Sequence, residues 1–358
     1  MTTPLRADLE RVLTSFFGDD ASSAILRPFG SGLINSTYFV KSGDEEYILQ
    51  RINTAIFKDS FAVMKNIQLV TEHIRAKGGE TLDVVMTKDG GLLAEDPSGH
   101  FRMYKFVKDS RSFDVVTPEL FSVAAEEFGK FQRYLSDFDA SSISETIKDF
   151  HSTDKRLERF LKTVERDEFS RYASVKDLAE EIISLGEYAP LITSALAKGE
   201  IPTRVVHNDT KISNVLFSRD GRGLCVIDLD TVMPGSLLYD FGDAIRSGAA
   251  AEPEWSDAFE KVFLREDLYR SFAMGYIRGT GGSMTDRELS LLPLSAFVLT
   301  YELAIRFLDD YLDGDRYFAP KDKELNRIRA KNQLILAKDI LSKLPRLSKI
   351  TESCADMA

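Results

Sequence analysis

The stretch VVHNDTKISNVLF, residues 205–217, places a run of polar side chains between two apolar segments. Asp209 and Asn214 have the spacing D-x-x-x-x-N, and His207 stands two residues before the aspartate. The apolar run LCVIDLD at 224–230 follows the turn-forming residues SRDGRG and has Asp228 near its end. The pattern predicts a polar loop that leads into a short hairpin, which brings Asp209, Asn214 and Asp228 to one edge.

These side chains have the chemistry that phosphoryl transfer from ATP requires. A carboxylate must orient the acceptor hydroxyl and receive its proton, and oxygen ligands must hold Mg²⁺ against the phosphates. Asp209 fits the first role, and Asn214 and Asp228 fit the second, because Mg²⁺ prefers hard oxygen ligands. The alternative is that each one only satisfies backbone groups in a turn. Their joint spacing favours catalysis, and His207 is assigned to bracing the loop.

The overall composition is that of an ordinary globular protein, with 43% hydrophobic and 29% charged residues in 358. The net charge of −11 argues against a nucleic-acid partner, because phosphate contacts need clustered Lys and Arg. The N-terminal residues predict an amphipathic helix and no signal peptide, and no apolar run approaches the ~18 residues of a membrane span. With two cysteines, no disulfide framework is indicated. We expect a cytoplasmic protein, a monomer or weak homo-oligomer, without a membrane partner.

The chain divides into a sheet-rich part and a mostly helical part. Residues 1–107 predict a small antiparallel sheet with strands in 25–41, at 46–52 and three more before 108, and one main helix at 60–78. Residues 108–358 predict a helical lobe that contains the polar loop and hairpin within 203–246. Predicted helices of this lobe cover 118–135, 153–166, 175–197, 255–263, 267–277, 287–312 and 325–344, and TDRE at 285–288 matches a capping box.

A glycine-containing segment, FGSGLINSTY at 29–38, lies between the first two predicted strands. Gly30 and Gly32 would let backbone N–H groups approach a phosphate, and Asn35 follows them. An ordinary hairpin is the alternative. The phosphate-transfer residues downstream favour a nucleotide contact for Gly30, Gly32 and Asn35.

In these residues the sequence resembles the aminoglycoside phosphotransferase and choline kinase superfamily. VVHNDTKISNVLF and VIDLDTVMPGSLLYDFGDAIR are similar to its catalytic and metal loops, and the resemblance spans about residues 25–335. IQLVTEHIRAKGGETLDVV and IRFLDDYLDGDRYFA are closer to the branch that acts on N-acetylhexosamines. The resemblance implies an α+β, bilobal protein-kinase-like fold with ATP and Mg²⁺ as cofactors. It also implies phosphorylation of the anomeric hydroxyl of N-acetylglucosamine or N-acetylgalactosamine.

The resemblance also implies roles for single residues. Asp209 would be the catalytic base, Asn214 and Asp228 would hold Mg²⁺, and Asp240 would steady the catalytic loop from below. The segment RMYKFV at 102–107 would be the hinge between the lobes, beside adenine. The nucleotide contacts predicted there are Met103, Tyr104 and Phe106.

One position departs from the superfamily pattern. Kinase-like N-lobes carry Lys or Arg on the third strand to grip the α- and β-phosphates. The matching position is Gln50, because Ile48 and Gln50 share a face while Arg51 points the other way. Arg51 or another cation then substitutes, or Mg²⁺ and backbone amides bind the phosphates without it. Gln at this position resembles the hexosamine branch, so Gln50 is kept as a nucleotide contact.

The predicted helix at 287–312 supplies candidates for the acceptor site. Glu302, Arg306 and Asp309 recur along one stripe with Asp313, and Glu302 pairs with Arg306 at i, i+4. A solvated helix face is the alternative. The resemblance assigns Arg306 and Tyr317 to the acetamido sugar. Asp230 and Arg246 are further substrate candidates by their position near the metal loop, and Trp255 is expected to be a core anchor.

Two other functions stay open from the sequence. One keeps the kinase and changes its acceptor to an aminoglycoside, a choline-like amine or another sugar. The other is a nucleotide-binding pseudokinase, suggested by Gln50.

Overall fold

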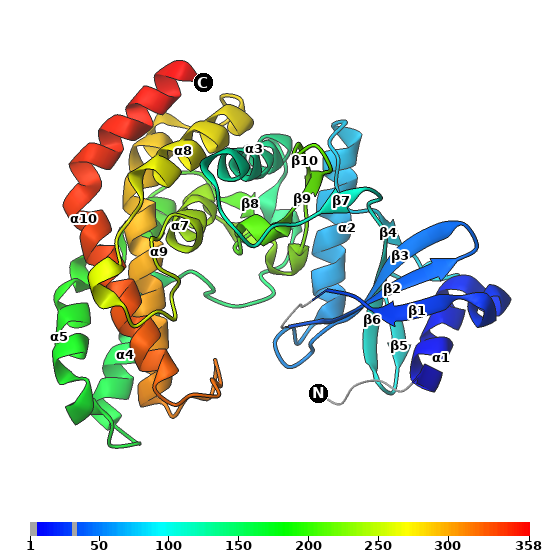
Figure 1. The fold of residues 1–358 in the computed structure, drawn as a ribbon, viewed down its shortest axis with the longest axis horizontal. Helices are drawn as coiled ribbons and strands as arrows, with labels where there is room; N and C mark the ends of the chain where they lie inside the picture. Colours follow the sequence, from blue (N-terminus) through cyan, green and yellow to red (C-terminus); the bar gives the residue numbers. More distant parts are fainter. Residues whose placement is uncertain (1–5, 31–33) are drawn as a thin grey trace.

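The computed structural model describes residues 6–30 and 34–358 and has two lobes (Figure 1). The N-lobe is an antiparallel sheet with strand order β1-β2-β3-β6-β4, in which β5 also pairs with β6. This confirms the predicted α+β bilobal fold with a small sheet lobe. The strands are β1 (Ile25–Pro28), β2 (Ser36–Ser42), β3 (Glu45–Arg51), β4 (Val84–Val85), β5 (Ala94–Asp96) and β6 (Gly99–Lys105).

Two helices pack against the sheet, the predicted N-terminal amphipathic helix and the predicted main helix. Helix α1 (Arg6–Phe17) buries Leu13 and Phe16 against Leu49 and Met103 of the sheet, in a core of their own. Helix α2 (Ser60–Ala76) lies between the lobes (Figure 1), and its apolar side chains belong to the large core of the C-lobe. Because side chains alternate along a strand, the neighbours of Leu49 and Met103 point to the other face of the sheet.

The chain passes from one lobe to the other between β6 and β7 (Ser110–Arg111). Strand β7 pairs with β9 (Val215–Ser218), which pairs with β10 (Gly223–Val226) in the register Phe217 to Gly223. The predicted hairpin is therefore confirmed. Strand β8 (Arg204–Val206) pairs with β11 (Met233–Gly235), so the loops 207–214 and 227–232 leave from two small sheets side by side.

Helices build the rest of the C-lobe, around the long central helix α9. The predicted capping box at its start is present, with Thr285 and Glu288 exchanging hydrogen bonds. The predicted helix at 175–197 is two helices, because Gly186 weakens it and Pro190 cannot continue it. The helices are α3 (Pro118–Tyr134), α4 (Thr153–Arg166), α5 (Lys176–Ser184), α6 (Leu191–Ala197), α7 (Leu237–Gly248), α8 (Glu266–Thr280), α9 (Asp286–Leu312) and α10 (Leu325–Met357).

The segment 255–263 is not the predicted helix. It forms one short turn at Phe259–Lys261, because buried Asn332 of α10 donates to the carbonyl oxygens of Pro253 (3.1 Å) and Ser256 (3.0 Å), which holds the segment in a loop. Trp255 in this loop is 65% exposed, so its expected role as a core anchor is wrong.

Helix α9 corrects a further expectation from the sequence. It is long and apolar enough to cross a membrane by length and composition, with a mean hydropathy of 1.6 over its best 18-residue window. However, 83% of that window is buried among other helices of the protein. Its apolar length therefore reflects a core helix of a large lobe.

Candidate active site

The catalytic loop is fixed from below by Asp240, in the first turn of α7. Its carboxylate accepts hydrogen bonds from the backbone N–H groups of His207 (3.0 Å) and Asn208 (2.7 Å) and from the side chain of Gln132 (3.0 Å). Burial raises the pKa of Asp240, while His207 and the two backbone donors favour its charged form. These contacts match the supporting role predicted for Asp240.

His207 braces the same loop from inside. Its Nε2 donates to the carbonyl oxygen of Ile227 (2.9 Å), and its Nδ1 accepts from the backbone N–H of Asp209 (3.2 Å). The two partners are satisfied by a neutral imidazole with its proton on Nε2. The ring is fully buried with its edges toward Phe128 and Phe131. These contacts match the predicted bracing role, and they tie the catalytic loop to the segment that carries Asp228.

Asp209 is held by one carboxylate oxygen. Its Oδ2 accepts from the ammonium of Lys211 (2.8 Å) and from Nδ2 of Asn214 (3.2 Å), which also donates to the backbone oxygen of Asp209 (2.9 Å). The side chain of Asp209 remains 34% exposed, so Oδ1 can face a substrate. Although burial raises the pKa of Asp209, attraction to Lys211 outweighs it and the pKa lies below its ordinary value. The carboxylate is therefore ionised at neutral pH, as a general base must be.

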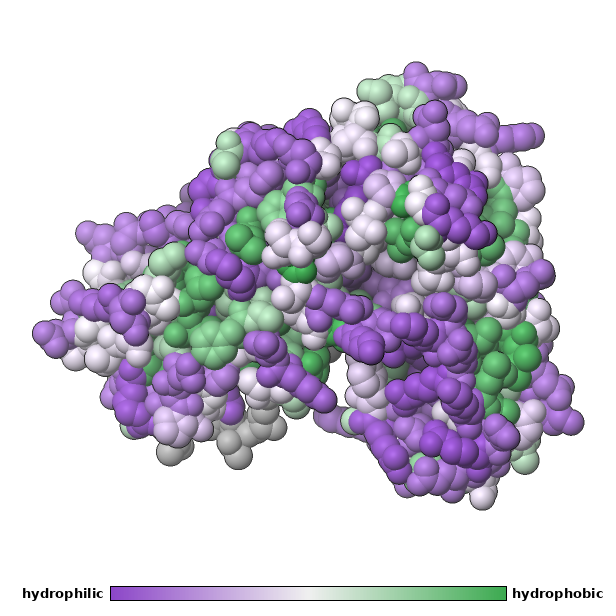
Figure 2. Space-filling model, turned by 180° about the vertical axis from the view of Figure 1, so that it is seen from behind, coloured by the Kyte–Doolittle hydropathy of each residue, from purple (hydrophilic) through white to green (hydrophobic). Residues whose placement is uncertain are grey.

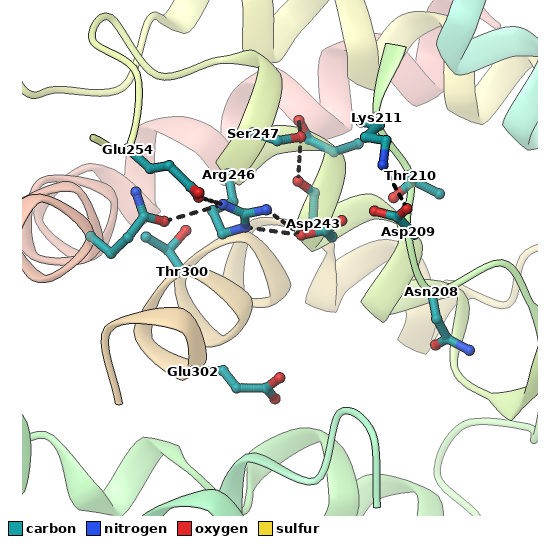
Figure 3. A network of polar contacts seen from close by, with 12 residues as sticks. Asn208, Asp209, Thr210, Lys211, Asp243, Arg246, Ser247, Glu254, Thr300 and Glu302 are labelled. Atoms are coloured by element: carbon teal, nitrogen blue, oxygen red, sulfur yellow. Dashed lines mark hydrogen bonds and ion pairs between the residues drawn. The ribbon is translucent and has the colours of Figure 1, made fainter. Parts of the chain in front are cut away.

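Lys211 is a site residue that the sequence analysis missed. It lies beside Asp209 in Figure 3, and its ammonium also feels the charges of Asp228 and Asp243. Burial lowers the pKa of Lys211, but attraction to Asp209, and then to Asp228 and Asp243, outweighs the burial. The pKa therefore lies above its ordinary value. Its position two residues after the aspartate in HNDTK was the available signal. A fixed cation there can stabilise negative charge on a transferring phosphate.

Asp228 ends the hairpin in a left-handed backbone conformation, with φ of 60°. Burial and repulsion from Asp230 and Asp209 raise its pKa, while Lys211 and Arg102 lower it. Asp228 thus feels the negative charge of two other carboxylates. A divalent cation would relieve this repulsion.

The predicted metal ligands fit Mg²⁺ by their chemistry. Because Nδ2 of Asn214 is used by Asp209, its amide oxygen is the group left for a cation. The backbone oxygen of Asn214 accepts from the N–H of Ile227 (2.9 Å), the residue before Asp228. Within residues 6–30 and 34–358, no cluster of three or more His, Cys, Asp and Glu side chains could hold a metal ion. A magnesium ion here would therefore be bound by one carboxylate and one amide, together with phosphate oxygens and water, which is a common way to bind Mg²⁺.

The nucleotide side of the site contains a buried polar network between the lobes. Arg102 of β6 donates to Oε1 of Gln50 from Nε (3.0 Å) and Nη2 (2.8 Å), and its Nη1 pairs with Asp230. Asn35 donates to the other carboxylate oxygen of Asp230 (2.7 Å), and Asn35 Oδ1 accepts from the backbone of Asn53 (2.9 Å). This geometry places Asp230 at the junction of the lobes instead of in the predicted sugar site.

Among the other predicted nucleotide contacts, Met103 is turned away from the junction of the lobes. The side chain of Met103 is buried under α1, on the opposite sheet face from Gln50, which leaves only its backbone for a nucleotide. Gly32 lies outside the described residues, and Gly30 has φ of 70° with open space where a Cβ would be.

Tyr104 and Phe106 lie on the inner face of the sheet. The ring of Tyr104 lies 5.3 Å from the guanidinium of Arg102, and the ring of Phe106 packs edge-on against Phe29 (5.8 Å) and Phe39 (5.4 Å). These aromatic side chains are suited to flank a base.

The acceptor side is organised by Arg306 of α9. Its guanidinium lies over the rings of Phe150 (5.5 Å) and Tyr317 (5.8 Å), and its Nη1 is 3.6 Å from the carboxylate of Glu302. The structure therefore brings Arg306 and Tyr317 together, as predicted. Glu302 is fully buried, and Asp309 is 7% exposed and paired with Arg159, so this stripe is not a solvated face.

Glu302 connects Arg306 to the catalytic loop. Its carboxylate accepts from Nδ1 of His151 (3.0 Å) and from the hydroxyl of Thr153 (2.7 Å). Nε2 of His151 lies 3.2 Å from the backbone oxygen of Asn208, next to Asp209. Both ring nitrogens of His151 thus face oxygen atoms. The sequence analysis did not single out His151. It named Glu302 only as part of the helix stripe.

Arg246 has a structural role in this structure, in contrast to the predicted substrate contact. Its guanidinium pairs with Asp243 (2.9 Å) and Glu254 (2.9 Å), as Figure 3 shows. Glu254 also pairs with Arg329 of α10. The side chain of Arg246 is only 12% exposed. These pairs fix α7 to the loop after it and to α10.

Comparison with known proteins identifies the family. Residues 25–274 match the model of the phosphotransferase enzyme family. The fold is similar to that of a microcompartment-associated aminopropanol kinase, with a TM-score of 0.62 and 16% identity over 94% of this chain and 97% of that one. An aminoglycoside phosphotransferase from Alicyclobacillus acidocaldarius gives a TM-score of 0.63 and 13% identity over 99% and 98% of the two chains.

A third similar structure is a spectinomycin phosphotransferase in complex with ADP and spectinomycin. Its TM-score is 0.58 and its identity is 14%, over 96% of this chain and all of that one. At these identities the structures show the fold alone, and the family match covers more than half of the chain. The chain belongs to the phosphotransferase enzyme family and is an ATP-dependent small-molecule kinase.

Proposed function

We propose that the enzyme transfers the γ-phosphoryl group of ATP to the anomeric hydroxyl of N-acetylglucosamine or N-acetylgalactosamine, as an N-acetylhexosamine 1-kinase. The observation that carries this choice is the acceptor side of the site, where Arg306 lies against aromatic rings above the buried Glu302. A guanidinium can donate to the carbonyl oxygen of an acetamido group, and aromatic faces pack against the apolar face of a sugar ring.

The charge on this side favours a neutral acceptor over a polyamine. Burial lowers the pKa of Arg156, and repulsion from nearby Arg306 lowers it further, so two guanidinium groups lie close together. The carboxylate of Glu302 is shared with His151, and Asp309 is paired with Arg159. An aminoglycoside or a choline-like amine would meet this positive charge, which costs affinity.

The catalytic residues have complementary roles in this reaction. Asp209 orients the hydroxyl of the acceptor and takes its proton as the new O–P bond forms, and ADP leaves as the old bond breaks. Lys211 holds Oδ2 of Asp209 and places a positive charge beside the transferring group. Asn214 and Asp228 would hold Mg²⁺, which neutralises charge on the phosphates when bound.

The compartment that suits this activity is the cytoplasm, which supplies ATP. Cys225 and Cys354 are both free and buried, as is usual where thiols stay reduced. Burial raises the pKa of the Cys225 thiol to about 12, so it is unreactive at neutral pH.

A panel of acceptors tests the proposal, with ADP release as the measurement. We expect turnover with both N-acetylhexosamines and none with the 1-O-methyl glycoside of N-acetylglucosamine, whose anomeric oxygen is blocked. Glucose is the matched control for the acetamido group and is expected to react poorly. Preference for kanamycin or choline over the amino sugars would refute the sugar assignment.

Thermal shift separates this kinase from a pseudokinase that shares the fold. We expect MgATP to raise the Tm, and the amino sugar to raise it further. Stabilisation by MgATP without turnover of any acceptor in the panel would favour the pseudokinase.

A further inference from the structure

The inner face of the N-lobe sheet lacks a cation at its usual position on the third strand. In kinase-like folds a Lys or Arg there grips the α- and β-phosphates. Here Gln50 occupies that position on β3. Arg102 lies directly opposite it on β6, because the register pairs Gln50 with Arg102.

Arg51 cannot fill the gap from the same strand. Its charge acts on Tyr38, whose ring is buried on the α1 face of the sheet, and its side chain lies beside Gly99. It therefore points away from the lobe junction. Arg102 is the cation that this part of the sheet turns toward the catalytic loops.

The contacts of Arg102 orient it toward the metal loop. Gln50 is fixed by donating from Nε2 to Thr37 (3.1 Å), so its Oε1 faces Nε and Nη2 of Arg102. The third nitrogen, Nη1, pairs with Asp230, which stands two residues after Asp228. Both partners are almost fully buried, with side chains 1% and 4% exposed. A neutral amide is what this position needs, because a Lys at position 50 would meet the guanidinium of Arg102 in a space without water.

We propose that Arg102 replaces the missing third-strand cation. It is a positioning residue that ties the loop of Asp228 and Asp230 to the N-lobe sheet, and its positive charge lies on the phosphate side of the metal carboxylate. Gln50 is then the acceptor that holds the relocated cation. The charge needed for the nucleotide phosphates has moved one strand along the sheet.

Contacts between the two lobes support this proposal. Asp230 receives Arg102 on one carboxylate oxygen and Asn35 on the other, so strand β6 and the segment just before β2 hold one residue of the C-lobe loop. The proposal rests on the use of ATP by this family and does not depend on the sugar.

Moving the positive charge from position 102 on β6 to position 50 on β3 tests the proposal. Binding is measured by calorimetry without acceptor, using Mg²⁺ with a non-hydrolysable ATP analogue, and adenosine as the matched ligand without phosphates. We expect Arg102→Gln to weaken binding of the Mg²⁺–analogue complex by about tenfold or more, with adenosine binding unchanged. The double variant Gln50→Lys/Arg102→Gln, which returns the cation to β3, is expected to recover most of that affinity.

Two results would overturn the proposal. One is parental affinity of Arg102→Gln for the Mg²⁺–analogue complex. The other is a double variant that binds this complex no better than Arg102→Gln while retaining adenosine binding. If Arg102→Gln does not fold, the affinity of the double variant for the Mg²⁺–analogue complex decides, because this variant carries a cation on the same sheet face. Neither result concerns the acceptor, so a failure here is distinct from a failure of the sugar assignment.

Discussion

Replacing Asp209 by Asn changes one atom at the point where the proton is taken up. The amide oxygen can occupy the place of Oδ2 and keep the hydrogen bonds from Lys211 (2.8 Å) and Asn214 (3.2 Å). The amide nitrogen then occupies the place of Oδ1, where it cannot accept a proton. The loop is supported by Asp240 and His207, which are unchanged, so we expect the variant to fold with nearly parental Tm.

The expected loss is in kcat. A positioned general base contributes roughly 10²–10⁴ in rate, which is about 3–5 kcal/mol of transition-state stabilisation. Asp209→Asn should therefore turn over at less than about 1% of the parental rate at saturating MgATP and amino sugar. The assay is ADP release, with Tm and MgATP binding measured on the same preparation.

Asp220→Asn is the matched control, since Asp220 lies in the hairpin turn with a side chain 62% exposed. It should keep parental kcat. If Asp209→Asn binds MgATP and retains more than about a tenth of parental kcat, Asp209 is not the general base.

Three further predictions concern the support of the site, the acceptor and the N-lobe. Asp240→Asn should lower the free energy of unfolding by about 1–3 kcal/mol, measured with urea, because one backbone donor of the catalytic loop then faces an amide N–H; unchanged stability would contradict the supporting role. Arg306→Ala should raise KM for the amino sugar by roughly tenfold, with KM for ATP unchanged in the ADP-release assay; an unchanged sugar KM would exclude the contact. Burial raises the pKa of Asp96, but hydrogen bonds from Arg11 and Ser98 outweigh the burial. They lower this pKa to about 2, below the ~3.9 of an unfolded chain. The resulting stability is present above pH ~4 and is lost as the pH falls toward about 2. The urea midpoint of the parent should therefore fall more steeply over this range than that of Arg11→Met, and equal pH dependence would show that the Arg11–Asp96 pair contributes nothing.

The parts of the site that the sequence predicted are local in the chain. Asp209 and Asn214 lie in one loop, and the hairpin that carries Asp228 follows at once, so spacing and turn residues were sufficient to bring them together. The capping box at Thr285 was predictable for the same reason.

The parts that the sequence did not predict depend on pairs far apart in the chain. Arg102 and Asp230 are 128 residues apart, and nothing near either one indicates the other. His151 and Glu302 are 151 residues apart. Arg246 was assigned to substrate from its place near the metal loop, but its charge is taken by Asp243 and Glu254. Such pairings depend on how lobes and helices pack, which periodicity and local motifs do not contain.

The central claim is that the side chains of Asp209, Asn214 and Asp228 direct phosphoryl transfer from ATP onto the hydroxyl at the sugar's first carbon. Phosphorus NMR of the product formed from MgATP and N-acetylglucosamine examines it in one spectrum. The account predicts a phosphate resonance coupled to the anomeric proton. A phosphate coupled instead to the C6 protons, or inorganic phosphate and ADP without any sugar phosphate, would contradict it.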